Sequence, residues 1–333
     1  MDAKISIVIP TRNRTESLNR LLSSIEKQTL TPEEVIVVDA SDPGKKDRLV
    51  DTCFPLKVLT SRPSVCAQRN LGIREAKGEY ILLCDDDIVL PENYLATTRQ
   101  FLNSNPNEGA VTGIWLQKDA HDQWVSYYPI LSLKKLFFAW FFGHSIWGPI
   151  DLKGVSGLWS PLYGRLKKVF KEKKNSLARS GWPQNTEFDA EVVKVAVTSL
   201  GSALVRKSWF EIAQFDEALD AHGYGDNYGV CVQFPGDRPV NVLTSLKVEH
   251  YHSSVNRNKA LHATYRRTLA LSYFISKKGH RIPGRKLFFL WSVFGHSLAG
   301  LVSFNFPLAW VYIKVFFVAA ANKTIFLQAE NDK

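Results

Sequence analysis

The chain has 333 residues and lacks the short motifs that usually mark redox, zinc or nucleotide-binding loops. Its four cysteines are far apart and form no CxxC pair, so neither a disulfide framework nor a zinc site is expected and a reduced compartment is predicted. The absence of GxGxxG and GxxxxGK[ST] argues against a dehydrogenase and a P-loop NTPase. The first apolar run, residues 5–9, is too short for a signal-peptide core, so no signal peptide is expected.

Acidic residues are the minority among the charged ones. Lys and Arg number 42 against 32 Asp and Glu, which gives a net charge of +10 at pH 7. Such a balance predicts an anionic partner, either a phosphorylated substrate, an acidic membrane surface or a nucleic acid. The basic residues cluster beside apolar segments and no nucleic-acid-binding motif is present, so nucleic acid is not expected.

Three adjacent carboxylates follow a short apolar run. Residues 80–84 read Tyr-Ile-Leu-Leu-Cys, as in a strand buried on both faces, and Asp85, Asp86 and Asp87 come next. Ligands of open α/β sheets bind beyond the carboxyl ends of the strands, and oxygen donors favour Mg²⁺ or Mn²⁺. The run therefore predicts a metal site that leaves positions open for substrate phosphate, with a solvated acidic turn as the alternative.

The first hundred residues alternate between strand and helix patterns. Residues 5–10, 34–39 and 57–59 are apolar strand candidates, and Leu18, Leu21, Leu22 and Ile25 follow helical spacing. Residues 69–72 are expected in a helix, and 113–116 are expected to continue the sheet. This order predicts an α/β fold with a mostly parallel, Rossmann-like sheet and helices on both faces.

Several segments together resemble one enzyme family. They are residues 7–14 (Ile-Val-Ile-Pro-Thr-Arg-Asn-Arg), 37–42, 68–72 (Gln-Arg-Asn-Leu-Gly) and the Asp triplet, then 200–207 with 215–217, and 265–278. In this order they resemble a family-2 glycosyltransferase with the GT-A fold, of the bacterial rhamnosyltransferase-like branch. The resemblance implies a nucleotide-sugar-binding half at 1–110 and an acceptor-binding half at 111–260, with a basic and aromatic insertion around 130–180. A C-terminal apolar helical extension is expected at 261–333.

The resemblance also implies a donor site that contains a divalent cation, Mn²⁺ or Mg²⁺. Asp87 is the expected direct ligand, with Asp85 nearer the ribose and the metal-bound waters. A histidine near the end of the catalytic domain is expected as a further ligand, and His250 and His252 are the candidates, with His250 favoured. These two would point to the same side of an extended segment.

The remaining donor contacts are expected at the strand ends. The predicted nucleotide-sugar-binding residues are Pro10, Thr11, Arg14, Asp39, Arg69, Asp85 and Asp86. The first three would line the base pocket, Asp39 would bond base or ribose, and Arg69 would pair with a phosphate or stack on the base. Taken alone, Arg69 also fits a surface salt bridge, and Asp39 fits a cap or turn residue.

The expected catalytic base departs from the family pattern. The family places a Glu-Asp pair after a Gly-rich turn, whereas this chain has Asp226-Asn227. An amide cannot take up a proton, so Asp226 is predicted as the base, with Asp216, Glu217 and Asp220 as alternatives. One base without an evident nucleophile implies, by the resemblance, direct displacement with inversion.

Two segments point to lipid. Residues 165–179 carry seven basic residues against one acid, which fits either a solvated helix face or a platform for phosphorylated lipid. Residues 287–313 contain no charged side chain but are interrupted by His296, Asn305 and Pro307. They fit an in-plane or re-entrant membrane element, a span, or a pair of packed helices. A cytoplasmic protein bound peripherally to the inner, anionic face of a membrane is predicted.

The leading hypothesis is a metal-dependent inverting hexosyltransferase of polysaccharide biosynthesis. It would move a sugar from a UDP, dTDP or GDP donor to a hydroxyl of a cell-envelope glycan or lipid-linked acceptor. One alternative is a catalytically degenerate GT-A module that binds nucleotide or membrane as a scaffold. Another is a sugar nucleotidyltransferase, which would need a Gly- and Arg-rich phosphate loop that residues 10–14 lack.

Overall fold

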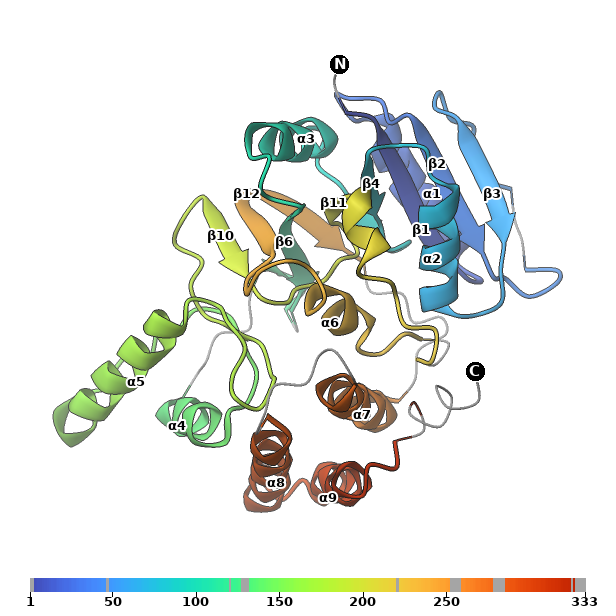
Figure 1. Cartoon of the computed structure of the whole chain (residues 1–333). Coiled ribbons are helices and arrows are strands. Elements are labelled where there is room, and N and C mark those ends of the chain that lie inside the picture. The colour runs from blue at the N-terminus through green and yellow to red at the C-terminus, as the bar shows by residue number, and fades with distance from the viewer. Residues whose placement is uncertain are drawn as a thin grey trace. The chain divides into compact units, whose positions relative to one another are not determined.

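A computed structural model describes residues 3–45, 48–119, 121–126, 132–219, 222–251, 259–277, 285–324 and 326. The chain divides into two compact units (Figure 1). The first contains Met1–Ser126, Asp189–Lys194 and Thr198–Arg257, and the second contains Tyr127–Phe188, Val195–Val197 and Asn258–Lys333. This division rests on contacts within the chain. The predicted donor and acceptor halves are defined by their ligands and stay a prediction.

The main sheet has the mostly parallel form that the strand pattern predicts. Its order is β10-β12-β6-β11-β4-β1-β2-β3, and β5 and β7 pair with β12 and β6. The bounds are β1 Ile5–Thr11, β2 Glu34–Asp39, β3 Leu56–Thr60, β4 Tyr80–Leu83, β5 Ile88–Val89, β6 Ala110–Lys118, β7 Trp124–Val125, β10 Val192–Val195, β11 Leu204–Arg206 and β12 Val240–His250. Strands β1 to β4 pair in parallel, β12 is parallel to β6, and β11 lies antiparallel between β4 and β6.

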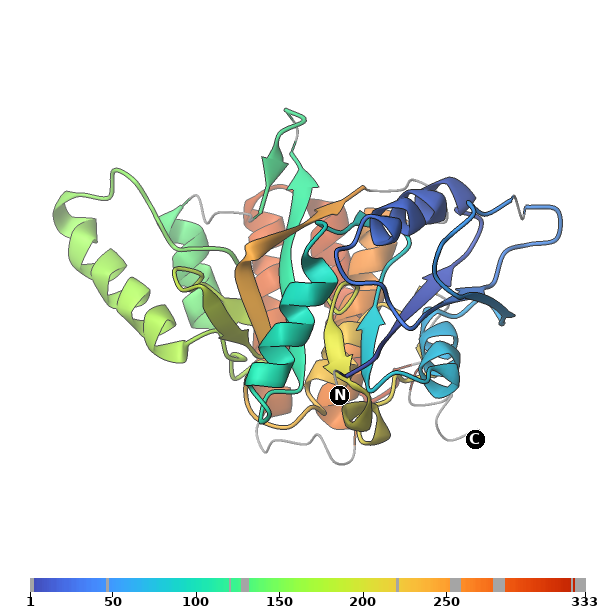
Figure 2. The same cartoon turned by 90° about the horizontal axis from the view of Figure 1, so that it is seen from above.

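Helices cover both faces of this sheet, and every residue of β1 is therefore buried. Ile7 and Ile9 face α1 (Thr15–Glu26) and share a core with its buried leucines. The opposite face receives α2 (Val65–Glu75), where a Cβ on Gly72 would lie only 2.3 Å from Val8 Cγ1. Figure 2 shows α1 and α2 on opposite sides of the first strands. The remaining helices of this unit are α3 (Tyr94–Ser104), the 3₁₀ turn η2 (Lys207–Glu211) and α6 (Asp226–Cys231).

A short antiparallel strand pairing fixes the position of the segment that follows β4. The two residues of β5 pair with the end of β12, so that His250 lies opposite Ile88 and Glu249 opposite Val89. The backbone N–H of Tyr251 also donates to the Asp87 carbonyl at 2.8 Å. The turn that contains the three aspartates is therefore held beside the carboxyl end of β12.

The second unit contains most of the remaining helices. They are α4 (Leu133–Phe142), η1 (Gly157–Trp159), α5 (Ser160–Lys173), α7 (Ala260–Ser276), α8 (Arg285–Val302) and α9 (Phe306–Ala320), with β8 (Ile146–Trp147) parallel to β9 (Gln184–Asn185). The predicted C-terminal helical extension is confirmed. Residues 287–313 form parts of two helices that pack closely, since a Cβ on Gly300 would lie 2.9 Å from the backbone N of Ala309. In the described part of the chain, no helix has the length and apolar character that a membrane crossing requires.

Candidate functional site

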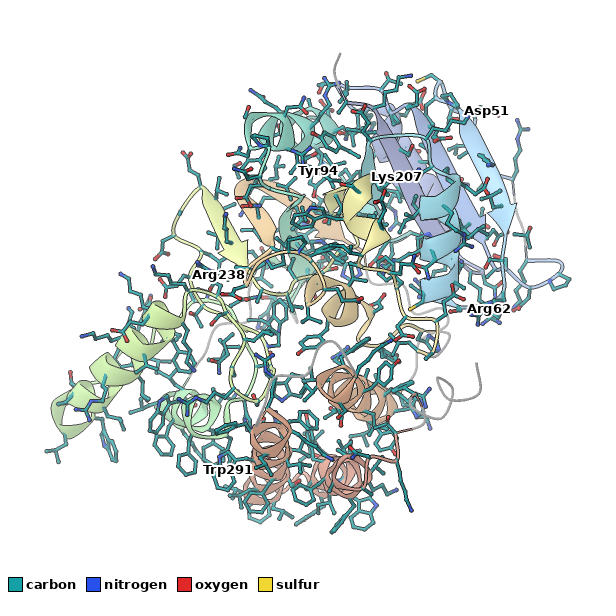
Figure 3. All side chains as sticks on the ribbon, viewed as in Figure 1. Asp51, Arg62, Tyr94, Lys207, Arg238 and Trp291 are labelled. Atoms are coloured by element: carbon teal, nitrogen blue, oxygen red, sulfur yellow. The ribbon has the colours of Figure 1, made fainter. Side chains whose placement is uncertain are left out.

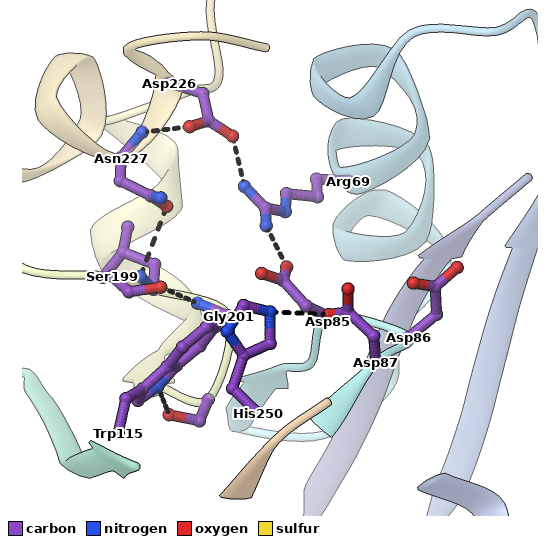
Figure 4. A network of polar contacts seen from close by, with 12 residues as sticks. Arg69, Asp85, Asp86, Asp87, Trp115, Ser199, Gly201, Asp226, Asn227 and His250 are labelled. Atoms are coloured by element: carbon purple, nitrogen blue, oxygen red, sulfur yellow. Dashed lines mark hydrogen bonds and ion pairs between the residues drawn. The ribbon is translucent and has the colours of Figure 1, made fainter. Parts of the chain in front are cut away.

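Polar side chains converge at the carboxyl edge of the main sheet, all within the first unit (Figure 4). Thr11 ends β1, Asp39 ends β2, and His250 ends β12. The aspartate turn follows β4, and Asp226 begins α6. Because parallel strands end at the same edge, segments separated by more than a hundred residues meet here.

Arg69 links two of the predicted carboxylates. Its side chain is 3% exposed, and its guanidinium donates to Asp85 Oδ1 at 2.5 Å and to Asp226 Oδ2. The guanidinium also lies over the Phe215 ring, with its carbon 5.0 Å from the ring centroid. Burial lowers the pKa of Arg69, but the facing carboxylates of Asp226 and Asp85 outweigh that effect and the net shift is upward. Arg69 therefore stays charged and neutralises part of the negative charge at this edge.

Asp226 is a buried carboxyl with an altered acidity. Burial raises its pKa to about 6, against the lowering effect of the Arg69 charge. Its second oxygen, Oδ1, accepts from the backbone N–H of Asn227 at 2.6 Å. A carboxyl of this kind changes protonation near neutral pH, which suits a group that accepts a proton.

The Asn227 side chain carries no acidic group and makes a structural hydrogen bond. Its side-chain oxygen accepts from the backbone N–H of Leu200 at 3.3 Å. Of the other predicted bases, Glu217 is bonded to Arg62 at 2.6 Å and to Asn70 at 3.0 Å, and Asp220 lies outside the described residues. Asp226, the predicted base, contacts the Arg69 guanidinium directly.

Asp86 is held by the end of β1. Thr11 Oγ1 donates to its Oδ2 at 2.7 Å, and the Arg14 guanidinium donates to its Oδ1 at 3.1 Å. Burial raises the pKa of Asp86 to about 6, with Arg14 opposing the shift and Asp87 adding to it. Thr11 and Arg14, both predicted for the base pocket, therefore contact the aspartate turn.

Asp87 and His250, both predicted as metal ligands, lie in contact with each other. His250 Nε2 is 3.3 Å from Asp87 Oδ1, and Arg14 Nη1 is 3.5 Å from Asp87 Oδ2. The imidazole ring rests against Trp115, with ring centroids 4.8 Å apart, and the Trp115 Nε1 donates to Ser202 Oγ at 2.7 Å. Packing against a hydrogen-bonded indole fixes the direction in which His250 points.

The donor set fits a divalent cation in part. Carboxylate oxygen with imidazole nitrogen is a combination that Mn²⁺ accepts, and Asp87 and His250 provide it side by side. Asp85 faces Arg69 instead, and His252 lies outside the described residues. Throughout the described ranges, no group of three His, Cys, Asp or Glu side chains is arranged to hold a metal.

The Gln-Arg-Asn segment at the start of α2 connects the parts of the site. Gln68 Nε2 donates to the carbonyls of Thr11 at 2.8 Å and Val38 at 2.7 Å, which ties together the ends of β1 and β2. Asn70 exchanges hydrogen bonds with the backbone of Phe215 at 2.8 and 3.1 Å. With Arg69 between them, three successive residues join both strand ends, two carboxylates and the segment at 215–217.

The remaining donor predictions lie at the same edge. Asp39 is buried, pairs in register with Thr11 across β1 and β2, and accepts from the Ser41 N–H at 2.7 Å, as a turn residue does. Pro10 precedes Thr11 in β1 and is also buried. Their contact with a nucleotide stays a prediction.

Sequence reasoning missed several supporting residues. Trp115 and Ser202 position His250, Phe215 lies under Arg69, and Gly201 makes room for Asp85. A Cβ on Gly201 would lie 2.3 Å from Asp85 Oδ2, while the Gly201 carbonyl accepts from the Asp85 N–H at 2.8 Å. Gly201, Ser202 and Phe215 belong to motifs quoted above, but a motif does not show which partner each residue contacts.

Comparisons with known proteins bear on the family and the fold of the chain. The profile described as "Glycosyl transferase family 2" matches residues 6–174. The chain is 45% identical over 87 residues to an uncharacterized glycosyltransferase, YwdF, of Bacillus subtilis (strain 168), covering 25% of this chain and 32% of that one. It is 31% identical over 115 residues to the poly(ribitol-phosphate) beta-N-acetylglucosaminyltransferase TarP of Staphylococcus aureus (strain N315), covering 32% and 35%. These matches span about a third of each relative.

Solved structures with a similar fold include S. aureus TarS 1-349 in complex with UDP-GlcNAc. The TM-score is 0.52 at 14% identity, with 95% of this chain and 81% of that chain covered. The mannosyltransferase PcManGT from Pyrobaculum calidifontis, in complex with GDP-Man and Mn²⁺, gives a TM-score of 0.51 at 12% identity, with 97% and 89% covered. Likeness at this identity concerns the fold, and it confirms the predicted GT-A class. Because the family profile covers half of the chain, the chain belongs to glycosyl transferase family 2.

Proposed function

We propose that the chain is a metal-dependent, inverting glycosyltransferase that moves a sugar from a nucleotide-sugar donor to an acceptor hydroxyl. The observation that carries the proposal is the single guanidinium of Arg69, which contacts both Asp85 and the buried Asp226. Asp85 belongs to the aspartate turn, where the donor is proposed to bind, and Asp226 is the proposed base. One buried residue thus connects the two halves of the reaction.

The donor side needs a positive charge as the diphosphate leaves. Asp87 and His250 would hold Mn²⁺ or Mg²⁺, with Asp85 nearer the ribose, and the ion would act as a Lewis acid on the leaving phosphates. Thr11 and Arg14 orient Asp86 beside this position. The neighbours solved with UDP-GlcNAc and with GDP-Man and Mn²⁺ support a UDP, dTDP or GDP sugar as donor.

The acceptor side needs a proton acceptor. Asp226 would take the hydroxyl proton as the oxygen attacks the anomeric carbon, and its raised pKa makes it a stronger base than an exposed aspartate. Arg69 holds the carboxylate in place and favours its charged form. A single proposed base without an evident enzymatic nucleophile supports direct displacement, and hence inversion.

The acceptor is proposed to be a cell-envelope glycan or a lipid-linked sugar. The net charge of +10 supports an anionic surface or acceptor, and the relative TarP is named for poly(ribitol-phosphate), a phosphorylated polymer. The reaction would then take place on the cytoplasmic side, at the anionic inner face of a membrane.

Replacing the proposed base tests the catalytic assignment. In Asp226→Asn, sugar transfer from a panel of UDP, dTDP and GDP sugars is expected to fall about 10²–10⁴-fold, the usual contribution of a general base. Donor binding, measured by titration calorimetry, is expected to be retained because the amide still accepts a hydrogen bond from Arg69.

The matched control is Asp216→Asn, a nearby carboxyl among the alternative bases, which is expected to keep near-normal turnover. Normal turnover in Asp226→Asn, or loss of turnover only in Asp216→Asn, would show that the base assignment is wrong. Unmodified protein that binds donor but never transfers sugar would favour a non-catalytic binding module.

A further inference from the structure

Large apolar side chains face solvent on one group of helices in the second unit. The docking face is defined here by Phe141 of α4, Trp291 and Phe294 of α8, and Phe306, Trp310 and Phe317 of α9. Each is at least 40% exposed, and Phe317 reaches 67%. Figure 3 shows ring side chains along the outer sides of these helices, with Trp291 labelled. Large apolar side chains exposed together on neighbouring helices usually mark a binding site.

The exposure follows helical spacing, so it is a property of whole helix faces. In α9, Phe306, Trp310 and Phe317 lie at i, i+4 and i+11, while Ala309 and Val315 point inward. In α8, Trp291 and Phe294 lie on the same stripe, and Phe289 and Val293 are buried. Each helix therefore buries one apolar face in the unit and presents a second one to solvent.

Direct contacts join α4 to this surface. The indole N–H of Trp291 donates to the Phe141 carbonyl at 3.0 Å, and the two rings meet edge to face with centroids 5.4 Å apart. Gly300 brings α9 against α8 on the other side, close to Ala309. The three helices that carry the docking face therefore pack against one another, α4 against α8 and α8 against α9.

The Lys, Arg, Asp and Glu side chains of the three helices that carry the docking face are all basic. The sequences of α4, α8 and α9 contain no Asp or Glu. Lys134 and Lys135 are exposed at the start of α4, Arg285 and Lys286 begin α8, and the Lys314 ammonium lies 5.5 Å from the centre of the Trp310 ring. Aromatic rings with adjacent basic residues suit the boundary between acyl chains and anionic headgroups.

We infer that the docking face inserts in the plane of an anionic phospholipid bilayer, to the depth of the headgroup and upper acyl region. No described helix has the properties of a span, which is consistent with helices that lie along the surface. Two copies of this chain joined through the same face would bring the basic residues of these helices together, whereas anionic lipid complements them. The inference deepens the proposed function, on which its biological meaning rests, by assigning the membrane contact to named helices.

Vesicle flotation tests this assignment without any sugar transfer. The full chain is expected to float with vesicles of equimolar phosphatidylcholine and phosphatidylglycerol, and to float far less with pure phosphatidylcholine. The variant Phe306→Ser/Trp310→Ser/Phe317→Ser is expected to bind anionic vesicles at least about tenfold more weakly, because the burial of apolar surface in the bilayer is lost. Its matched control is Val58→Ser/Ile212→Ser, which removes exposed apolar side chains from the first unit and is expected to bind normally.

A second pair of variants tests the charge. Lys134→Glu/Lys135→Glu is expected to lose the preference for anionic vesicles, while Lys27→Glu/Arg74→Glu, on exposed positions of the first unit, is expected to keep it. Circular dichroism checks that each variant is folded.

Equal flotation of the two serine variants would overturn the inference, as would a protein that binds no vesicles but forms dimers through this face. Donor hydrolysis in solution reports separately on the active site, so failure of the membrane assignment and failure of the transferase proposal give different results.

Discussion

Two buried aspartates define the chemistry of the site at the residue scale. Asp86 and Asp226 both have a pKa raised to about 6, chiefly by burial, and each faces an arginine that opposes the shift. They differ in their contacts, because Asp86 is held by Thr11 and Arg14, and Asp226 by Arg69. The first therefore belongs to the proposed donor side and the second to the proposed acceptor side.

The raised pKa of Asp226 predicts the pH dependence of catalysis. The base works only when deprotonated, so turnover is expected to fall as the pH decreases through about 6. An ordinary aspartate would lose activity only near a pH of about 4. The measurement is the pH profile of kcat, with circular dichroism recorded at each pH to confirm that the protein stays folded.

Asp86 titrates in the same range and needs its own control. In Asp86→Asn, overall activity is expected to decrease because the donor site is altered. The acid limb of the kcat profile, which is the fall in turnover at low pH, is expected to stay near its original pH. If the limb disappears in this variant, Asp86 and not Asp226 is responsible for it. If the unmodified protein shows no acid limb near 6, the role of Asp226 as base is contradicted.

At the scale of the element, α2 is the helix that holds the site together. Residues 68–70 on this helix contact two strand ends, two carboxylates and the Phe215 segment. The helix can reach all of them because it lies unusually close to β1 and β2. Gly72 permits that approach, since any Cβ there would lie 2.3 Å from Val8 Cγ1 and 3.2 Å from Val38 Cγ2.

The close approach predicts that Gly72→Ala destabilises the protein. The added methyl must displace either buried valine or the helix, and overpacking of this kind usually costs about 1–3 kcal/mol. Urea unfolding followed by fluorescence is expected to show a lower midpoint, together with reduced turnover because Arg69 moves with the helix. The matched control is Gly164→Ala in α5, where a Cβ would meet no atom within 4 Å and no loss of stability is expected. An unchanged midpoint in Gly72→Ala would show that α2 adjusts without cost.

At the scale of the whole molecule, the two units have different chemical characters. The first contains the sheet and every described member of the candidate site. The second carries the docking face and the basic helix α5. Donor binding by the first unit and membrane contact by the second stay proposals that the experiments below and above address separately.

Ligand binding by the folded chain predicts a metal-dependent gain in thermal stability. A nucleotide that binds only the native state, present at about a hundred times its Kd, stabilises it by about 2.7 kcal/mol. A panel of UDP, dTDP and GDP with their sugar derivatives is expected to raise the Tm in the presence of Mn²⁺, and excess EDTA is expected to abolish the shift.

The variant Asp87→Asn is expected to lose the Mn²⁺-dependent part of this shift, whereas Asp51→Asn, an exposed carboxyl near Arg48, is expected to retain it. A Tm that rises equally with nucleotide in Mn²⁺ and in EDTA would contradict a metal-bound donor. The nucleotide that gives the largest shift would identify the donor class.

The sequence by itself determined the strand–helix order, the mostly parallel sheet and the edge at which the site lies. Those features depend on local patterns, because a buried strand must be apolar along its length and polar residues must follow where it ends. The same reasoning selected Asp226 over Asn227, since only the carboxylate can accept a proton.

Only the tertiary structure decided which side chains meet. The pairing of β5 with β12 brings His250 to Asp87. The buried Arg69 contacts Asp85 and also Asp226, which is 157 positions further along the chain. It also decided that residues 287–313 form parts of two packed helices with an exposed apolar face. Such contacts depend on strand order and helix packing across the whole chain, and a local pattern records which residues are buried but not the partner against which each is buried.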